Sequence, residues 1–170
     1  MNDADFQVGR IFTVPLLGGG YAFGYLTYYR KGKLPLVDIF DYVGDEPTPP
    51  KDIASKPVLM RDMFVGAEFI LAPKHKAGER WRFTKETMPG PVKPHNRYYR
   101  MGSPPRSFRR IDILGEEPDV PLSPEEAQKY PTVGNSFAPT PTAQIEVAAK
   151  RLLLSPADLV KSWRERKPSN

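Results

Sequence analysis

The sequence of 170 residues contains no cysteine and only two histidines, His75 and His95. The absence of cysteine excludes disulfide frameworks, thiolate metal sites and cysteine nucleophiles. Both histidines stand in loop sequence rich in lysine and proline, where solvated side chains are more common than metal ligands. We therefore expect no metal and no cofactor. Hydrophobic residues make up 39% of the chain, which is enough for a packed core.

Only one long stretch lacks charge, the segment from Ile11 to Tyr29. Its length formally reaches that of a membrane-spanning helix, but Pro15 and the triplet Gly18–Gly20 would break such a helix near its centre. From Tyr21 onward, large side chains alternate with small ones, which is the period of a strand. The sequence therefore predicts a β-hairpin and no contact with a membrane. The acidic start, residues 1–5, also differs from the basic start of a signal peptide.

The first two-thirds of the chain has the pattern of β-structure. β-Branched and aromatic residues recur in short runs that glycine and proline separate. We predict a mainly β fold of the α+β class: a small, strongly curved antiparallel sheet or half-barrel with a C-terminal helical hairpin. The expected strands cover residues 6–14, 21–29, 36–43, 58–65, 67–71, 80–84 and 108–114.

Three regions follow from this pattern: a β-domain over residues 1–115, a proline-rich tether over 116–141, and C-terminal helices over 142–167 that pack on the β-domain. Proline is frequent, with 20 in the chain, and clusters in the loops and the tether.

The predicted C-terminal helices begin at two capping residues. The first would start at Thr142, and the second at Ser155, which precedes a proline and an acid. The pair Glu146 and Lys150 is expected on the solvent side of the first helix. The apolar stripe of that helix would dock on its own β-domain or on a second copy, so a monomer and a homodimer both remain open. The stripe consists of Ile145, Ala148, Ala149, Leu152 and Leu153.

The net charge of +5 is unevenly distributed. Residues 61–110 contain 12 Lys or Arg against 4 Asp or Glu, whereas the stretch 112–126 contains six acids and no base. Each pole could contact a partner, and the sequence does not choose between them. The acidic candidates are Glu116, Glu117, Asp119, Glu125 and Glu126, and the basic candidates are Arg97, Arg100, Arg106, Arg109 and Arg110.

Arginines and aromatic residues also alternate in the basic region, which is compatible with single-stranded nucleic acid. In a strand, however, Arg80 and Arg82 would face water while Trp81 and Phe83 face the core. A small nucleic-acid-binding β-barrel is therefore the alternative interpretation, and packed aromatic residues fit the spacing better.

The sequence contains no recognisable catalytic set. A strand, not a helix, follows Gly18–Gly20, so these glycines suit a hairpin turn better than a phosphate loop. Ser136 has no nearby base, and Asp38 and Asp41 would lie on opposite faces of one strand, where they cannot share a proton or a metal. We expect a protein that is not an enzyme.

Three segments carry a resemblance to a known family. They read VGRIFTVPL at 8–16, GYAFGYL at 20–26 and VDIFDY at 37–42. This pattern resembles the immunity protein 26 family of bacterial polymorphic-toxin systems, with weaker similarity as far as residue 114. Two positions depart from the family pattern: Arg10 stands where an acid is common, and Tyr25 where arginine is common.

The resemblance implies a β-rich cytoplasmic protein that binds and neutralises a cognate toxin in antibacterial competition, without catalysis. A toxin with a basic active site would select the acidic residues, and an acidic toxin would select the arginines.

Overall fold

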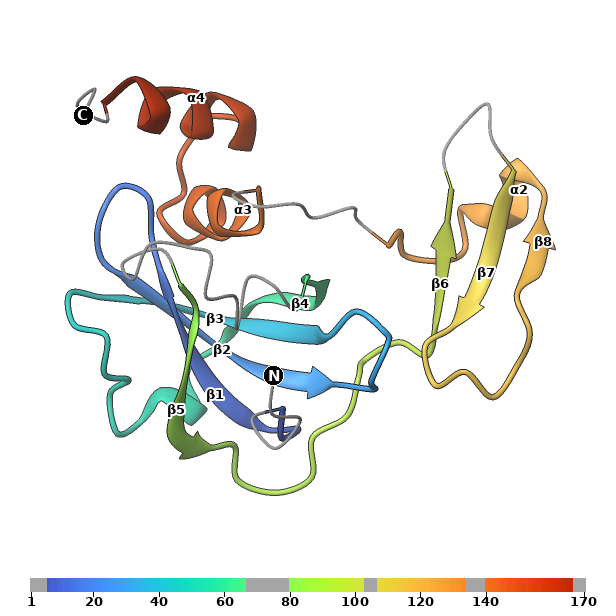
Figure 1. Cartoon of the computed structure of the whole chain (residues 1–170), viewed down its shortest axis with the longest axis horizontal. Helices are drawn as coiled ribbons and strands as arrows, with labels where there is room; N and C mark the ends of the chain where they lie inside the picture. The colour runs from blue at the N-terminus through green and yellow to red at the C-terminus, as the bar shows by residue number, and fades with distance from the viewer. Residues whose placement is uncertain (1–5, 67–79, 103–106, 134–139, 167–170) are drawn as a thin grey trace. The chain divides into compact units, whose positions relative to one another are not determined.

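Two separate antiparallel sheets, one of five strands and one of three, form the framework of the protein (Figure 1). The computed structural model describes residues 6–66, 80–102, 107–133 and 140–166. The chain divides into unit 1, residues 1–93 with 136–170, and unit 2, residues 94–135. The predicted class is confirmed, since the fold is mainly β and the C-terminal helices lie against each other. The larger sheet is not closed into a barrel.

Unit 1 contains the five-stranded sheet, in the order β4-β3-β2-β1-β5, and the two C-terminal helices. The strands occur where β-branched and aromatic residues are dense, and glycine turns separate β1 from β2. The expected strand at 67–71 lies outside the described residues. The elements are β1 (Arg10–Pro15), β2 (Tyr21–Tyr28), β3 (Leu36–Gly44), the 3₁₀ turn η2 (Ile53–Ser55), β4 (Val58–Phe64), β5 (Arg82–Thr87), α3 (Thr140–Ala149) and α4 (Pro156–Arg166).

Unit 2 contains the three-stranded sheet and one short helix. Its boundaries differ from the predicted regions, because it begins at Pro94 and includes most of the segment expected to be a tether. Pairing between residues distant in the sequence orders this segment, and local composition does not reveal such pairing. The elements are β6 (Tyr98–Met101), β7 (Phe108–Asp112), β8 (Val120–Leu122) and α2 (Pro124–Ala127).

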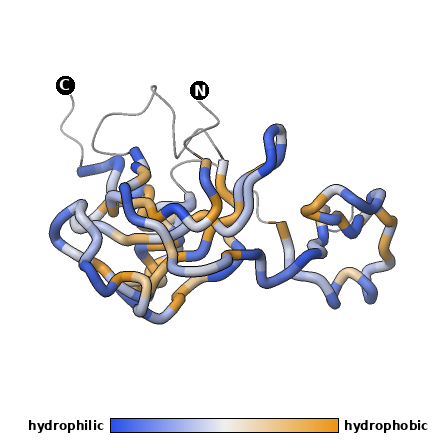
Figure 2. Tube along the Cα trace, turned by 90° about the horizontal axis from the view of Figure 1, so that it is seen from below, coloured by the Kyte–Doolittle hydropathy of each residue, from blue (hydrophilic) through white to orange (hydrophobic). Residues whose placement is uncertain are grey.

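The inner strands of the five-stranded sheet, β1, β2 and β3, are buried on both faces over most of their length. Phe12, Leu26 and Ile39 belong to one buried cluster, which Ile145 of α3 joins. Phe23 and Phe40 belong to a second cluster with Ile53 of η2. The hydropathy of the chain follows this arrangement, with hydrophobic stretches along the strands and hydrophilic ones at the loops (Figure 2). A central strand in such a sheet has no polar face, which explains the uncharged run that the sequence contains.

One carboxylate, that of Asp38 in β3, lies inside this sheet and is fully buried. The hydroxyl of Tyr25, directly opposite on β2, donates to Asp38 Oδ2 at 2.8 Å. The backbone N–H of Asp62 donates to Asp38 Oδ1, also at 2.8 Å. Asp62 has a positive φ of 51°, which turns its N–H out of the regular strand ladder. These bonds compensate the carboxylate for its lost hydration.

The helix α3 covers one face of the sheet, as predicted, but its ends and its buried face differ from the prediction. It begins at Thr140, two residues before the expected cap, and it ends at Ala149. Arg151, with a φ of +52°, stops the helix, because its N–H and that of Leu152 return to the carbonyls of Ala148 and Val147. The expected stripe therefore ends before Leu152 and Leu153, and Leu153 is fully exposed.

Glu146 was expected on the solvent side of α3, and this prediction is wrong, because its side chain is only 1% exposed. The ion pair with Lys150 does form, at 3.1 Å. The β1–β2 turn reaches both residues: Gly18 N–H donates to Glu146 Oε1 at 2.8 Å, and Lys150 Nζ donates to the Gly19 carbonyl at 2.8 Å. This contact fixes the helix to the glycine turn.

The second helix, α4, begins as the sequence predicts. Ser155 Oγ accepts the N–H of Asp158 at 3.1 Å, and Pro156 occupies the first helical position. Leu159 is buried, and α4 packs against α3.

The Tyr25–Asp38 bond supports a test by substitution. Burial, together with the hydrogen bond to Asp38, raises the pKa of Tyr25 well above its usual range. We expect Tyr25→Phe to lower the free energy of unfolding by about 1–3 kcal/mol at neutral pH, because the buried carboxylate loses a donor. The folded chain keeps the Tyr25 proton when the unfolded chain loses it at about pH 10. The difference between wild type and variant should therefore shrink as pH rises above that value.

Urea unfolding at a series of pH values measures this difference. Tyr28→Phe, on the same strand, is the matched control, because its hydroxyl makes no hydrogen bond with the described residues. A constant difference between wild type and Tyr25→Phe across alkaline pH would contradict the assignment.

Candidate functional site

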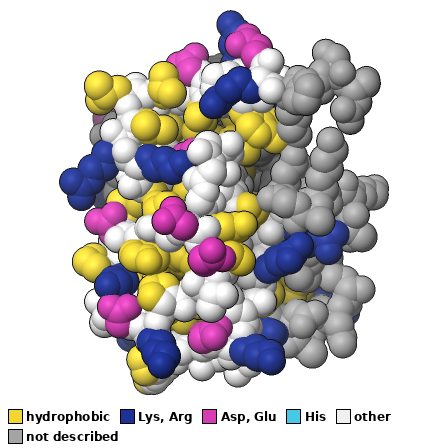
Figure 3. All heavy atoms as spheres, turned by 90° about the vertical axis from the view of Figure 1, so that its left-hand side faces the viewer, with side chains coloured by type: hydrophobic (Ala, Val, Ile, Leu, Met, Phe, Trp, Pro, Cys, Tyr) yellow, Lys and Arg dark blue, Asp and Glu magenta, His cyan; other side chains and the backbone are white. Residues whose placement is uncertain are grey.

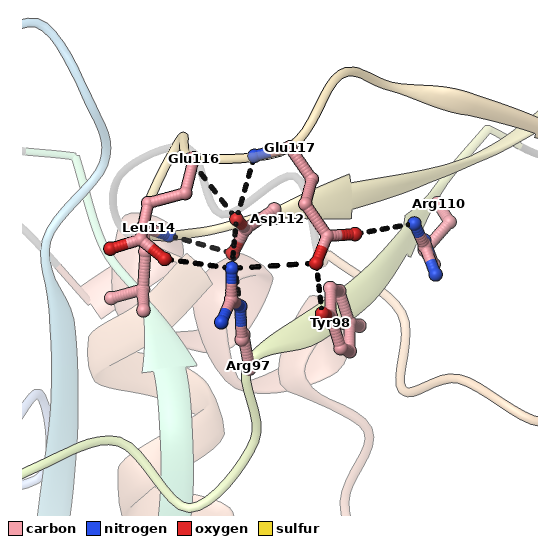
Figure 4. A network of polar contacts seen from close by, with 7 residues as sticks. All are labelled: Arg97, Tyr98, Arg110, Asp112, Leu114, Glu116 and Glu117. Atoms are coloured by element: carbon pink, nitrogen blue, oxygen red, sulfur yellow. Dashed lines mark hydrogen bonds and ion pairs between the residues drawn. The ribbon is translucent and has the colours of Figure 1, made fainter.

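All ten residues predicted for partner binding belong to unit 2. Residues 94–135 contain six Lys or Arg and six Asp or Glu, so the two charged poles of the sequence fold into one unit of zero net charge. Arg106 lies outside the described residues. The structure brings members of both predicted sets into one network, which Figure 4 shows.

Asp112, at the end of β7, is the centre of this network, and its side chain is only 1% exposed. The guanidinium of Arg97 binds both of its carboxylate oxygens, with Nε at 3.1 Å from Oδ1 and Nη2 at 3.0 Å from Oδ2. The backbone N–H groups of Leu114, Glu116 and Glu117 donate to the same carboxylate, each at 3.1 Å. The bond from Arg97, aided by these N–H groups, lowers the pKa of Asp112 to about 2.

The two glutamates after β7 bind the arginines of the opposite predicted set. Glu116 Oε2 accepts from Arg97 Nη2 at 2.8 Å. Glu117 accepts from Arg110 Nη2 at 2.8 Å and from the Tyr98 hydroxyl at 2.6 Å. The bond to Glu117 raises the pKa of Tyr98, and Arg110 also lies 4.5 Å from the centre of the Tyr98 ring. These charges stabilise unit 2 internally, and the sequence did not indicate that they are partners.

Two further candidates have internal roles. Arg100 Nε donates to Thr132 Oγ1 at 2.7 Å and its Nη1 to the Ala127 carbonyl at 3.3 Å. Glu126 accepts the N–H of Ser123, while Ser123 Oγ accepts the N–H of Glu126, which caps α2.

Three candidates remain available at the surface: Arg109, Asp119 and Glu125. Each is exposed, and none of the described residues forms a hydrogen bond or ion pair with their side chains. Charge reversal at these positions can therefore test binding without breaking the network around Asp112.

Two exposed apolar residues of unit 2 escaped the sequence prediction, Met101 and Val120, which are 49% and 38% exposed. The strand register places Met101 opposite Arg109 and Arg109 opposite Pro121, all of them exposed. We call Met101, Arg109 and Pro121, which the register places on one face, the unit 2 patch; Val120 pairs with Arg110 and lies on the other face. The sequence could not show it, because the segment before residue 105 was expected to be irregular and gave no register.

Trp81 and Phe83, the aromatic residues of the basic region that precede unit 2, are packed in unit 1. Trp81 is 1% exposed, stacks on Phe12 with 5.3 Å between ring centres, and donates its Nε1–H to Thr142 Oγ1 at 3.1 Å. Phe83 contacts the rings of Phe6 and Phe12 edge-on. Of the two interpretations of this segment, packing in the core is the one observed.

Unit 1 also contains a hollow of about 450 Å³ beside β1 and β5. Its lining includes Thr13, Tyr21, Arg80 and Arg82, together with Pro47 from the loop after β3. On the face shown in Figure 3, basic, acidic and hydrophobic side chains are interspersed.

Other classes of site were sought within the described residues. Over that part of the chain, no three His, Cys, Asp or Glu side chains gather in a way that could hold a metal ion. Likewise, none of the helices described is long and apolar enough to cross a membrane. Comparison of the chain with family models, curated proteins and solved structures finds no match.

The Asp112 network predicts a specific response to substitution. Asp112→Asn keeps the shape of the side chain but replaces one acceptor oxygen by a donor, facing groups that are themselves donors. We expect the exchange rates of the Leu114, Glu116 and Glu117 amide hydrogens to rise about tenfold or more, since a lost charged hydrogen bond is worth at least about 1.5 kcal/mol.

The same carboxylate predicts a pH dependence. Its folded pKa lies below the unfolded value of about 4, so its contribution is present above that pH and disappears as pH falls through about 2. The stability advantage of wild type over Asp112→Asn should therefore shrink between these values, as measured by urea unfolding. Asp119→Asn, exposed and outside the network, is the control; identical behaviour of the two variants would refute the assignment.

Proposed function

We propose that the protein binds a cognate bacterial toxin and neutralises it by contact, without catalysis, in the cytoplasm of the cell that makes it. The similarity to immunity proteins of polymorphic-toxin systems supports this proposal. The similar segments, 8–16, 20–26 and 37–42, include most of β1, β2 and β3, which form the buried centre of unit 1. The similarity therefore concerns the fold of unit 1 and does not identify the surface that would contact a toxin.

The unit 2 patch is the observation that carries the proposal. Apolar Met101 and Pro121 are exposed on one face of a small sheet, and Arg109 lies in register between them. Methionine and arginine are enriched in protein interfaces, where an apolar centre is surrounded by polar residues. The surrounding charges here are of both signs, since Asp119 and Glu125 are exposed nearby in the sequence.

The network around Asp112 supports a role in binding. Asp112 accepts bonds from Arg97 and from three backbone N–H groups, which fixes the loop after β7. A surface that is already ordered loses little conformational entropy on association. The network orders one end of the β6–β7 pair, and the patch lies at the other end of the same pair.

The alternative, a nucleic-acid-binding module, has less support. Stacking requires exposed aromatic faces, but Trp81 is buried, and the guanidinium of Arg110 lies over the Tyr98 ring. Of the basic residues, Arg97 and Arg110 already bind carboxylates of unit 2.

A binding and protection experiment tests the proposal. The product of the gene adjacent to the one encoding this chain is expressed in a bacterial host, alone and with this chain, because family members are encoded beside their toxins. We expect growth arrest by that product alone and protection by the chain. Arg109→Glu and Met101→Glu should each weaken the complex about tenfold or more, as measured by calorimetry, since central interface residues commonly contribute more than 1 kcal/mol.

Lys85→Glu, which reverses an exposed charge on unit 1, is the matched control and should leave binding unchanged. Unchanged thermal unfolding of each variant shows that the loss concerns contact. Wild-type affinity in both unit 2 variants would exclude the patch as the contact surface. If the chain fails to bind the neighbouring product but binds a single-stranded oligonucleotide with steep salt dependence, the alternative replaces the proposal.

A further inference from the structure

Methionine carries all the sulfur chemistry of this chain, because the sequence contains five methionines and no cysteine. The structure describes four of the five. Met63 is buried, and Met60 and Met88 are half-buried and pack against the two hydrophobic clusters of unit 1. Met101, in the unit 2 patch, is 49% exposed. Among the described methionines, Met101 therefore presents the largest fraction of its surface to solvent.

The surroundings of Met101 bear on what its oxidation would do. The strand register places Met101 directly opposite Arg109, so the two side chains share a face of the three-stranded sheet, with their Cβ atoms about 5 Å apart. None of the described residues forms a hydrogen bond or ion pair with the side chain of Arg109. A thioether sulfur is only a weak acceptor, whereas a sulfoxide is polar and carries an oxygen. Oxidation would therefore place a hydrogen-bond acceptor within reach of the Arg109 guanidinium.

We propose that Met101 is a site of oxidation by peroxide, and that the sulfoxide weakens binding at the unit 2 patch. In this step the sulfur attacks one oxygen of hydrogen peroxide, an S–O bond forms and the O–O bond breaks. The second oxygen leaves with both protons as water, so the sulfur loses two electrons and the peroxide gains them. The flexible apolar side chain becomes a polar one, which disrupts an interface that uses methionine. The effect on binding rests on the proposed function, whereas the site of oxidation does not.

Peptide mapping by mass spectrometry after treatment of the full chain with hydrogen peroxide tests the site. We expect Met101 to be oxidised about tenfold or more faster than Met63, because peroxide reaches a buried side chain only when the fold opens locally. Met60 and Met88 should also react more slowly than Met101. In urea that unfolds the chain, the four rates should converge, because exposure no longer distinguishes the side chains. Oxidation of Met101 no faster than that of the other three, or an undiminished advantage in urea, would overturn the inference.

Partial oxidation tests the effect on binding. The oxidised mixture is passed over a limiting amount of the immobilised product of the adjacent gene, and peptide mapping compares bound with unbound chains. We expect Met101 sulfoxide to be depleted about tenfold or more among the bound chains, since central interface residues commonly contribute more than 1 kcal/mol. Met88 sulfoxide, on unit 1, is the internal control and should be equally frequent in both fractions. Equal frequency of Met101 sulfoxide in the two fractions, or equal depletion of Met88 sulfoxide, would overturn the inference.

A variant without the sulfur gives a second measurement. Leucine has nearly the volume of methionine, so Met101→Leu keeps an apolar side chain at this position. Peroxide treatment should not lower the affinity that this variant has before treatment. A loss as large as that of the wild type would show that another residue is responsible, and would overturn the inference.

Failure of the inference differs from failure of the proposed function. If the unoxidised chain binds the adjacent product and Met101 sulfoxide binds equally well, the inference fails and the proposed function stands. If the unoxidised chain does not bind that product, the proposed function fails and the effect on binding fails with it. The peptide mapping decides the site of oxidation in either case.

Discussion

Burial of the inner strands of the five-stranded sheet on both faces is the constraint on which the rest of unit 1 depends. A sheet with two apolar faces cannot remain in water, so each face needs a cover. The helix α3 covers one face through Ile145, and the segment with η2 covers the other through Ile53. The segment with η2 lies in the sequence between β3 and β4, whereas α3 follows the last strand of the sheet by more than fifty residues, so covering the second face requires the chain to return. The same constraint explains why Asp38 requires both Tyr25 and the N–H of Asp62.

Unit 2 is an insertion in the sequence of unit 1. After residue 135 the chain returns to unit 1 and forms α3, which covers the sheet. Unit 2 stands in the sequence between β5 and α3, and it provides no strand of the larger sheet. Trp81, just before β5, donates to Thr142 in α3, so the ends of unit 1 on either side of unit 2 contact each other directly. Glu146 and Lys150 add a second contact, to the glycine turn. The two segments of unit 1 are therefore joined by side-chain contacts of their own. We expect substitutions on the surface of unit 2 to leave the five-stranded sheet intact.

Local sequence patterns predict those features that depend on neighbouring residues. The hairpin, the strands at 21–29 and 36–43, and the Ser155 cap all correspond closely to β2, β3 and α4. The end of α3 was missed because an arginine, Arg151, occupies the left-handed position where glycine is usual. The burial of Glu146 and the pairing of Arg97 with Asp112 were missed because each depends on contact between distant segments. Periodicity alone carries no information about such contacts.

Some charged side chains of unit 2 are held in internal ion pairs, and others are exposed at the surface. Only the exposed ones can contact a partner without breaking an internal pair. Since unit 2 has six charges of each sign, the whole excess of +5 belongs to unit 1. Long-range attraction depends on net charge and affects mainly the rate of association, whereas buried contacts affect mainly the rate of dissociation. If the unit 2 patch is the contact surface, as proposed above, the net charge and the contact surface belong to different units. Unit 1 would attract an acidic partner from a distance, while Met101 and Arg109 on unit 2 would determine how long that partner stays bound.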